Sequence, residues 1–189
     1  MKRSINIGIG FAAIWIILKL VAFNFQLFLI DLKPFIFATM LFVTLAICIA
    51  LYIKKRAQAS ANLLDDVKTG MVSSIIYTVI VSGFIYFYYH SIYPEFNTSK
   101  ISEMELLLED ESKVEELRKS NPDMENSSSD EIRSQVLSSI GQYYSAQFTM
   151  TITLLGLLIY STLNSLLISL IFRKVIFKDQ SDSSEPSAS

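Results

Sequence analysis

Hydrophobic residues gather in four long runs along this chain, and polar residues separate the runs. The clearest run, from Met71 to Tyr93, contains no Asp, Glu, Lys or Arg. At a rise of about 1.5 Å per residue a helix of this length reaches about 34 Å, which is enough to cross a hydrocarbon core of about 30 Å. The pattern therefore predicts four membrane-spanning helices, at about residues 5–28, 35–53, 71–93 and 146–172.

Signals at the ends of these runs indicate where each helix meets water. Pro34 suits the first turn of a helix, where its missing N–H would have no partner, and so marks the start of the second span. The first run follows Lys2 and Arg3 as in a secretory signal peptide, but it continues beyond the roughly 7–15 apolar residues usual there, so we expect an uncleaved span. The third run ends before Pro94 in aromatic residues of the kind that settle at a membrane interface, namely Tyr86, Phe87, Tyr88, Tyr89 and Tyr93.

The polar stretch between the third and fourth runs, residues 94–145, carries two signals for helix starts. Ser102 with Glu105, and Ser128 with Glu131, have the spacing of capping boxes. We expect one helix from Ser102 to Ser120 and a second that begins at Ser128 and could continue unbroken into the fourth span. Their apolar stripes should face each other or a partner, and consist of Met104, Leu107, Leu108, Val114 and Leu117 in the first helix and Ile132, Val136 and Ile140 in the second.

Basic residues are concentrated at one set of span ends, where Lys and Arg are usually retained in the cytoplasm. We therefore expect both termini in the cytoplasm and an extracytoplasmic loop at 94–145. That loop has twelve acidic and five basic residues, a net charge of −7, which disfavours a nucleic-acid partner. The nine residues on the predicted cytoplasmic side are Lys2, Arg3, Lys54, Lys55, Arg56, Lys68, Arg173, Lys174 and Lys178.

Together these patterns predict an all-α protein. Residues 1–178 should form a four-helix transmembrane bundle with an extracytoplasmic acidic helical hairpin between spans 3 and 4, and residues 179–189 a disordered cytoplasmic tail. Composition agrees with this class, since 51% of the residues are hydrophobic. The single cysteine, Cys48, allows no intrachain disulfide and no Cys-based metal site.

Lys19 is the one Lys, Arg, Asp or Glu within a predicted span, and a charge in that position is a functional candidate by default. Residues expected at a similar depth are Tyr86, Thr149 and Thr153, which would give a polar pocket open to the outside. The simpler interpretation is that the Lys19 ammonium snorkels to the nearby headgroups.

Small and polar residues recur at helical spacing in the third and fourth runs. Such faces allow helices to approach closely in lipid, so helix packing is the simpler interpretation and a solute path the alternative. Among these residues Asn164 is the strongest candidate for a specific contact, because an amide in lipid requires a hydrogen-bond partner. The three rows are Gly70, Ser74, Thr78 and Ser82; Ser161, Ser165 and Ser169; and Thr149, Thr153, Gly156, Tyr160 and Asn164.

Two further candidates lie at span ends. His90, the only histidine, has no second histidine or cysteine near it and is a poor metal ligand; an interfacial anchor is the simpler interpretation and a pH sensor the alternative. Asp65 and Asp66 could bind a cation or a partner, but acidic residues at a helix N-terminus more simply offset the helix dipole.

The sequence contains no His-Glu-x-x-His helix, no Gly-x-Ser-x-Gly turn and no Walker-type phosphate loop. We therefore expect no enzyme activity, no catalytic residues, no cofactor and no metal. A proton-coupled carrier usually needs a carboxylate or histidine relay within the bilayer, and the spans offer no Asp or Glu.

The order of these features resembles a family of four-span bacterial membrane proteins defined only as a domain of unknown function, DUF4199. The matching features are glycines in the first span (Gly8, Gly10), the third span beginning near Asp65–Gly70, and the aromatic exit Tyr88–Phe96. The acidic Met- and Glu-rich helical segment and the basic end of the last span agree as well. The resemblance implies a bacterial inner-membrane location and the same topology, and it implies no activity.

The function expected on these grounds is interaction. The leading hypothesis is a non-enzymatic interaction or scaffold protein of the lipid bilayer that contacts other membrane or periplasmic proteins through the acidic outer hairpin. The alternative is a small transporter or channel subunit, in which a homo-oligomer lines a polar path with the Thr, Ser and Asn faces and Lys19.

Overall fold

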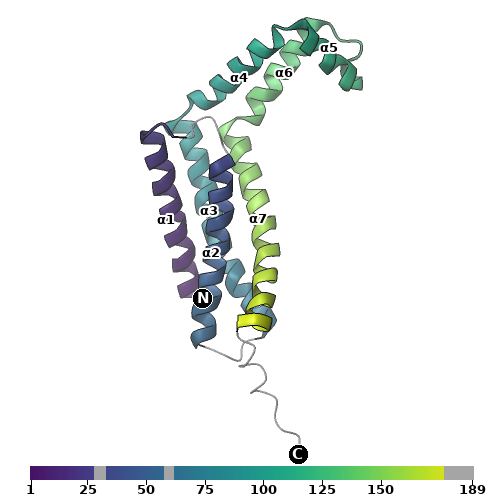
Figure 1. The fold of residues 1–189 in the computed structure, drawn as a ribbon. Coiled ribbons are helices and arrows are strands. Elements are labelled where there is room, and N and C mark those ends of the chain that lie inside the picture. Colours follow the sequence, from purple (N-terminus) through teal and green to yellow (C-terminus); the bar gives the residue numbers. More distant parts are fainter. Residues whose placement is uncertain (28–32, 58–61, 177–189) are drawn as a thin grey trace, which may run out of the picture. The chain divides into compact units, whose positions relative to one another are not determined.

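The computed structural model describes residues 1–27, 33–57 and 62–176, and these residues divide into two compact units. The first comprises Met1–Phe84 and Thr153–Ser189, and the second Ile85–Ile152. The predicted end of the first span at residue 28 and the predicted disordered tail, residues 179–189, lie outside the described residues. Figure 1 traces the chain through both units.

The first unit contains α1 (Lys2–Asn24) and α2 (Lys33–Ala57), together with most of α3 (Leu63–Phe87) and of α7 (Ala146–Ile171). Consecutive helices run in alternating directions (Figure 1). Helical segments long and apolar enough to cross a membrane are found at Lys2–Asn24, Lys33–Ala57, Leu63–Ile92 and Ala146–Val175. The third includes a π-helical turn at Tyr88–Ile92, and the fourth includes most of a second one at Phe172–Ile176. The predicted all-α class with four spans is confirmed.

Two helices extend further into polar sequence than the hydrophobic runs indicate. α2 continues through the three basic residues after Ile53 to Ala57, and α3 begins at Leu63, eight residues before Met71. A hydrophobic run marks only the part of a helix that lies in hydrocarbon, whereas backbone hydrogen bonds continue the helix beyond it. By contrast, α1 ends at Asn24, short of the predicted residue 28.

Side chains in the first unit are distributed in the manner of a membrane protein. Small polar side chains lie inside, as with Ser165 at 0% exposure, while large apolar ones point outward, as with Phe37 at 78%. In water this arrangement would expose far more apolar surface than a soluble protein tolerates, whereas lipid solvates apolar side chains well. The distribution therefore supports a protein that spans the bilayer.

The second unit contains α4 (Glu95–Leu108), α5 (Glu111–Ser120) and α6 (Ser129–Tyr143), with a 3-10 turn at Pro122–Met124. α4 and α5 both pack on α6. Their apolar stripes face each other around a small core of Leu108, Val114, Met124 and Ile132, with Met104, Leu117, Val136 and Leu137 packed at its edge.

The predicted helix Ser102–Ser120 is wrong at its start and at its middle. α4 begins at Glu95, directly after Pro94, so Ser102 lies inside a helix and caps nothing. The helix breaks at Glu109–Asp110, because the Asp110 side chain accepts a hydrogen bond from the Ser112 amide at 2.9 Å and caps α5. Leu107, expected in the buried stripe, is exposed.

The second predicted capping box is present. The Ser128 amide donates to Glu131 Oε2 at 2.8 Å, and the Glu131 amide donates to Ser128 Oγ at 3.3 Å. α6 does not continue unbroken into the fourth span, because it ends at Tyr143 and α7 begins at Ala146. In the gap, Ser145 Oγ accepts a hydrogen bond from the Phe148 amide at 3.2 Å and so caps α7.

Candidate functional site

A buried ion cluster joins the end of α2 to the start of α3. The Asp66 side chain, 1% exposed, lies between two ammonium groups, with Lys54 Nζ 3.2 Å from Oδ1 and Lys55 Nζ 2.9 Å from Oδ2. The chain places them there because the basic residues occupy the last turn of α2 and Asp66 the first turn of α3. Asn62 completes this end of α3, since its Oδ1 accepts a hydrogen bond from the Asp65 amide at 2.8 Å.

This cluster gives Asp66 a role that neither interpretation from the sequence included, an ion pair with the end of α2. Both carboxylate oxygens are occupied by ammonium groups, and the contacts are ion pairs rather than well-aligned hydrogen bonds. A metal cation would have to displace two positive charges. Among the described residues, no three His, Cys, Asp or Glu side chains gather where they could hold a metal ion. The cluster therefore serves as a joint between α2 and α3, and it retains a net charge of +1.

A second polar group ties α2 to α7. Asn164 Nδ2 donates to Thr44 Oγ1 at 2.7 Å, and Thr44 Oγ1 lies 2.9 Å from the Tyr160 hydroxyl. Asn164 thus has the partner that an amide within a span requires. Sequence reasoning missed Thr44, because pairing it with Asn164 requires knowing which helices are neighbours.

The first two rows of small and polar residues pack against each other between α3 and α7. A Cβ placed on Gly70 would lie 3.2 Å from Ser165 Oγ, and Thr78 Oγ1 lies 3.5 Å from Ser161 Oγ. α1 approaches α3 as closely, because a Cβ on Gly8 would collide with the Ser73 carbonyl oxygen. The rows are buried contact surfaces, which is the packing interpretation of their spacing.

Lys19 is buried in the first unit at 5% exposure, and its ammonium lies 3.7 Å from the centroid of the Phe35 ring. This is a cation–π contact, which stabilises an ammonium where water is scarce. Trp15, one turn earlier, also packs edge-on against Phe35, with the ring centroids 6.5 Å apart. The sequence indicates snorkelling for the Lys19 side chain and does not identify Phe35 as its neighbour.

The remaining predicted residues are divided between the units. Thr153 and Asn164 belong to the first unit, and Tyr86, His90 and Thr149 to the second. Within the second unit the His90 ring stacks on the Tyr86 ring, with centroids 5.3 Å apart and planes 9° from parallel. Thr149 and Thr153 are both half-buried. The polar pocket expected around Lys19 stays a prediction.

Comparison with known proteins identifies a family. No curated protein and no solved structure matches the chain. A family model described as a protein of unknown function, DUF4199, matches residues 6–174, which include the second unit and most of every span. This confirms the resemblance read from the glycines of the first span and the aromatic exit of the third. The chain therefore belongs to the DUF4199 family, whose function is unknown.

Proposed function

We propose that this protein is a non-enzymatic protein of a bacterial inner membrane, and that it acts by binding another protein through its second unit. Its termini lie in the cytoplasm and the second unit lies outside, as the bias of basic residues toward one set of span ends indicates. The partner is a protein surface that carries basic residues.

The observation that carries this proposal is the unneutralised acidic surface of the second unit. Most of its basic side chains are already paired with acidic side chains of the same unit: Lys100 with Glu103, Lys113 with Glu116, Arg118 with Glu115, and Arg133 with Glu111 and Asp130. Seven negative charges remain in excess between residues 94 and 145. Such a surface attracts a basic partner and accelerates their encounter.

Two exposed leucines on α4 supply the apolar part of a contact. Leu106 is 68% exposed and Leu107 is 52% exposed, beside the acidic residues Glu103 and Glu105. Exposed apolar side chains gain free energy when a partner removes them from water. α4 is therefore the part of the second unit that we assign to the partner.

The test is photocrosslinking in native membranes with a photoreactive residue at position 106. We expect one dominant protein adduct, which weakens when Glu103 and Glu105 are both replaced by Lys. A probe at Ile159, which is exposed on α7, is the matched control and should not give the same adduct. An adduct at position 106 that survives charge reversal, or no protein adduct at all, would contradict the proposal.

A transporter or channel subunit remains the alternative, although the first two rows of small and polar residues, on α3 and α7, pack against each other. Lys19 separates the two functions. Lys19→Leu should leave adduct formation at position 106 nearly unchanged in an interaction protein, whereas a pore that uses this ammonium would lose or invert its ion selectivity. Ion flux into vesicles containing the purified protein measures the second outcome.

A further inference from the structure

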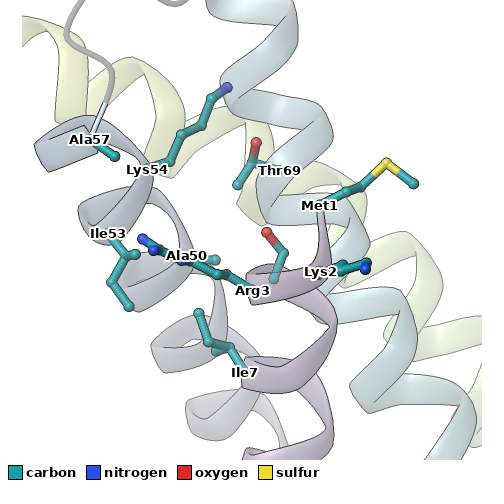
Figure 2. A pocket seen from close by; sticks show the side chains of 10 residues that line it. Met1, Lys2, Arg3, Ile7, Ala50, Ile53, Lys54, Ala57 and Thr69 are labelled. Atoms are coloured by element: carbon teal, nitrogen blue, oxygen red, sulfur yellow. The ribbon is translucent and has the colours of Figure 1, made fainter.

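A cavity of about 340 Å³ opens at the end of the first unit where α1 begins and α2 ends. Its walls come from the first two turns of α1, the last two turns of α2 and one residue of α3, Thr69 (Figure 2). It lies entirely within the first unit and includes none of the residues assigned to the partner contact. The end of a membrane-spanning bundle is the level at which lipid headgroups lie.

The charged lining of this cavity is basic. Lys2, Arg3 and Lys54 line it, and none of the described lining residues is acidic. Figure 2 shows the Arg3 side chain extending from α1 toward α2, near Ala50 and Ile53. Lys54 also contacts Asp66, but that carboxylate is shared with Lys55, so the cluster adds positive charge to this wall.

Hydrogen-bond donors are available beside these charges. The first turn of α1 lines the cavity, and that turn has neither an acidic residue nor a side-chain cap. Thr69 also lines the cavity, but its hydroxyl already donates to the Asp65 carbonyl oxygen at 2.7 Å. Uncapped amides at a helix N-terminus favour an anion. The Arg3 guanidinium adds a planar fork of donors that matches phosphate oxygens.

Apart from Ser4 and Thr69, the rest of the lining is apolar. It consists of Met1 and Ile7 from α1 and its start, and of Ala50, Ile53 and Ala57 from α2. A free phosphate ion would leave this apolar wall unused. A phospholipid would place its headgroup phosphate among the basic side chains and its glycerol and upper acyl segments along the apolar residues.

From this combination we infer that the cavity is a binding site for a phosphate-bearing anion, and that its occupant is the headgroup of an anionic phospholipid held between α1 and α2. Arg3 is the principal ligand, and Lys2 and Lys54 add positive charge. Basic pockets at the ends of membrane helices are a recurring form of lipid recognition.

The test measures lipid binding to the full-length protein in detergent, by thermal shift and by counting retained lipids in native mass spectrometry. The probes are phosphatidylglycerol, phosphatidylcholine and inorganic phosphate. We expect phosphatidylglycerol to raise the melting temperature and phosphatidylcholine to have little effect. Arg3→Gln should weaken phosphatidylglycerol binding about fivefold, the effect of one basic side chain near a membrane surface.

Two further variants distinguish binding at this cavity from general electrostatic attraction to the basic end of the protein. Lys68→Gln removes the same charge from an exposed residue next to Thr69 that does not line the cavity, and it should leave binding within about twofold. Arg3→Lys restores the charge and should recover most of the binding, which also shows that the loss in Arg3→Gln is not a folding defect.

The outcomes are distinct. Equal losses in Arg3→Gln and Lys68→Gln would overturn the site, because they would indicate attraction to the whole basic end. Stabilisation by inorganic phosphate that matches phosphatidylglycerol and depends on Arg3 would keep the phosphate chemistry but overturn the lipid as occupant. Equal binding of phosphatidylcholine would overturn the requirement for an anion.

Discussion

Asp66 is the residue on which the joint between α2 and α3 depends most. A carboxylate buried between two ammonium groups has exchanged its hydration for them, so removing it leaves positive charges close together with no counter-ion. The neighbouring Asp65 has the same chemistry but is exposed, and its position is governed by the Asn62 cap on its amide.

Asp66→Asn should therefore lower the free energy of unfolding by about 3 kcal/mol, the lower end for breaking a buried ion pair. Asp65→Asn is the matched control and should change it by less than about 0.5 kcal/mol. Chemical denaturation in detergent micelles measures both. Equal effects at the two positions would show that the ion cluster does not stabilise the fold.

At the element scale, two glycines of α1 that look alike in sequence differ in whether they contact another helix. Gly8 lies against the Ser73 carbonyl of α3, whereas a Cβ on Gly10 would meet no heavy atom within 4 Å. Gly8→Ala should cost about 2 kcal/mol, because the helix backbones must separate. Gly10→Ala should be neutral or stabilising by up to about 1 kcal/mol, because alanine favours the helix. Thermal unfolding of the two variants makes the comparison, and a Gly8→Ala as stable as Gly10→Ala would contradict the close α1–α3 contact.

The start of α6 should respond to pH through its capping box. The backbone amide of Ser128 donates a hydrogen bond to the Glu131 carboxylate. This bond, with a smaller contribution from the Ser128 side chain, holds the pKa of the Glu131 carboxyl below its ordinary value. The charged form is thus favoured in the folded helix. Its stabilisation is complete above the ordinary carboxyl pKa of about 4.3 and is lost as the pH falls through the lower, folded pKa.

Hydrogen exchange at the first turn of α6 tests this expectation. Protection there should fall on acidification in the native chain, and Glu131→Gln should remove that acid-dependent fall. Ser128→Ala should lower the protection by about 1 kcal/mol even at neutral pH, through loss of the cap. Protection in Glu131→Gln that falls with acid as steeply as in the native chain would assign the effect to other groups.

The helices themselves were easier to predict from the sequence than the residues at which they end or the contacts between them. The four spans follow from hydrophobic length alone, and the Ser128–Glu131 box from its spacing. Ser102–Glu105 has the same spacing but no cap, because Pro94 already allows a helix to begin at Glu95. The spacing of serines on α3 and α7 predicted a close contact, but the partners of Asn164 and Asp66 come from α2, and neighbours of that kind depend on tertiary packing.

At the scale of the whole molecule, four helices cross the bilayer, and we propose that the acidic second unit lies on the membrane face opposite the two termini. The polar interior and apolar exterior of the first unit support the crossings. The side on which the second unit lies follows from the basic residues at the span ends and is part of the proposal. An acidic unit on the same face as the termini would remove the basis for an external partner.

Labelling of single cysteines with a membrane-impermeant maleimide tests this layout most directly. The native Cys48 is replaced by Ala, and a cysteine is placed in turn at Lys2, Ser120 or Lys174, all of which are exposed. In intact cells we predict labelling at position 120 only, with positions 2 and 174 labelled after the membrane is permeabilised. Labelling of positions 120 and 174 from the same face would contradict the account.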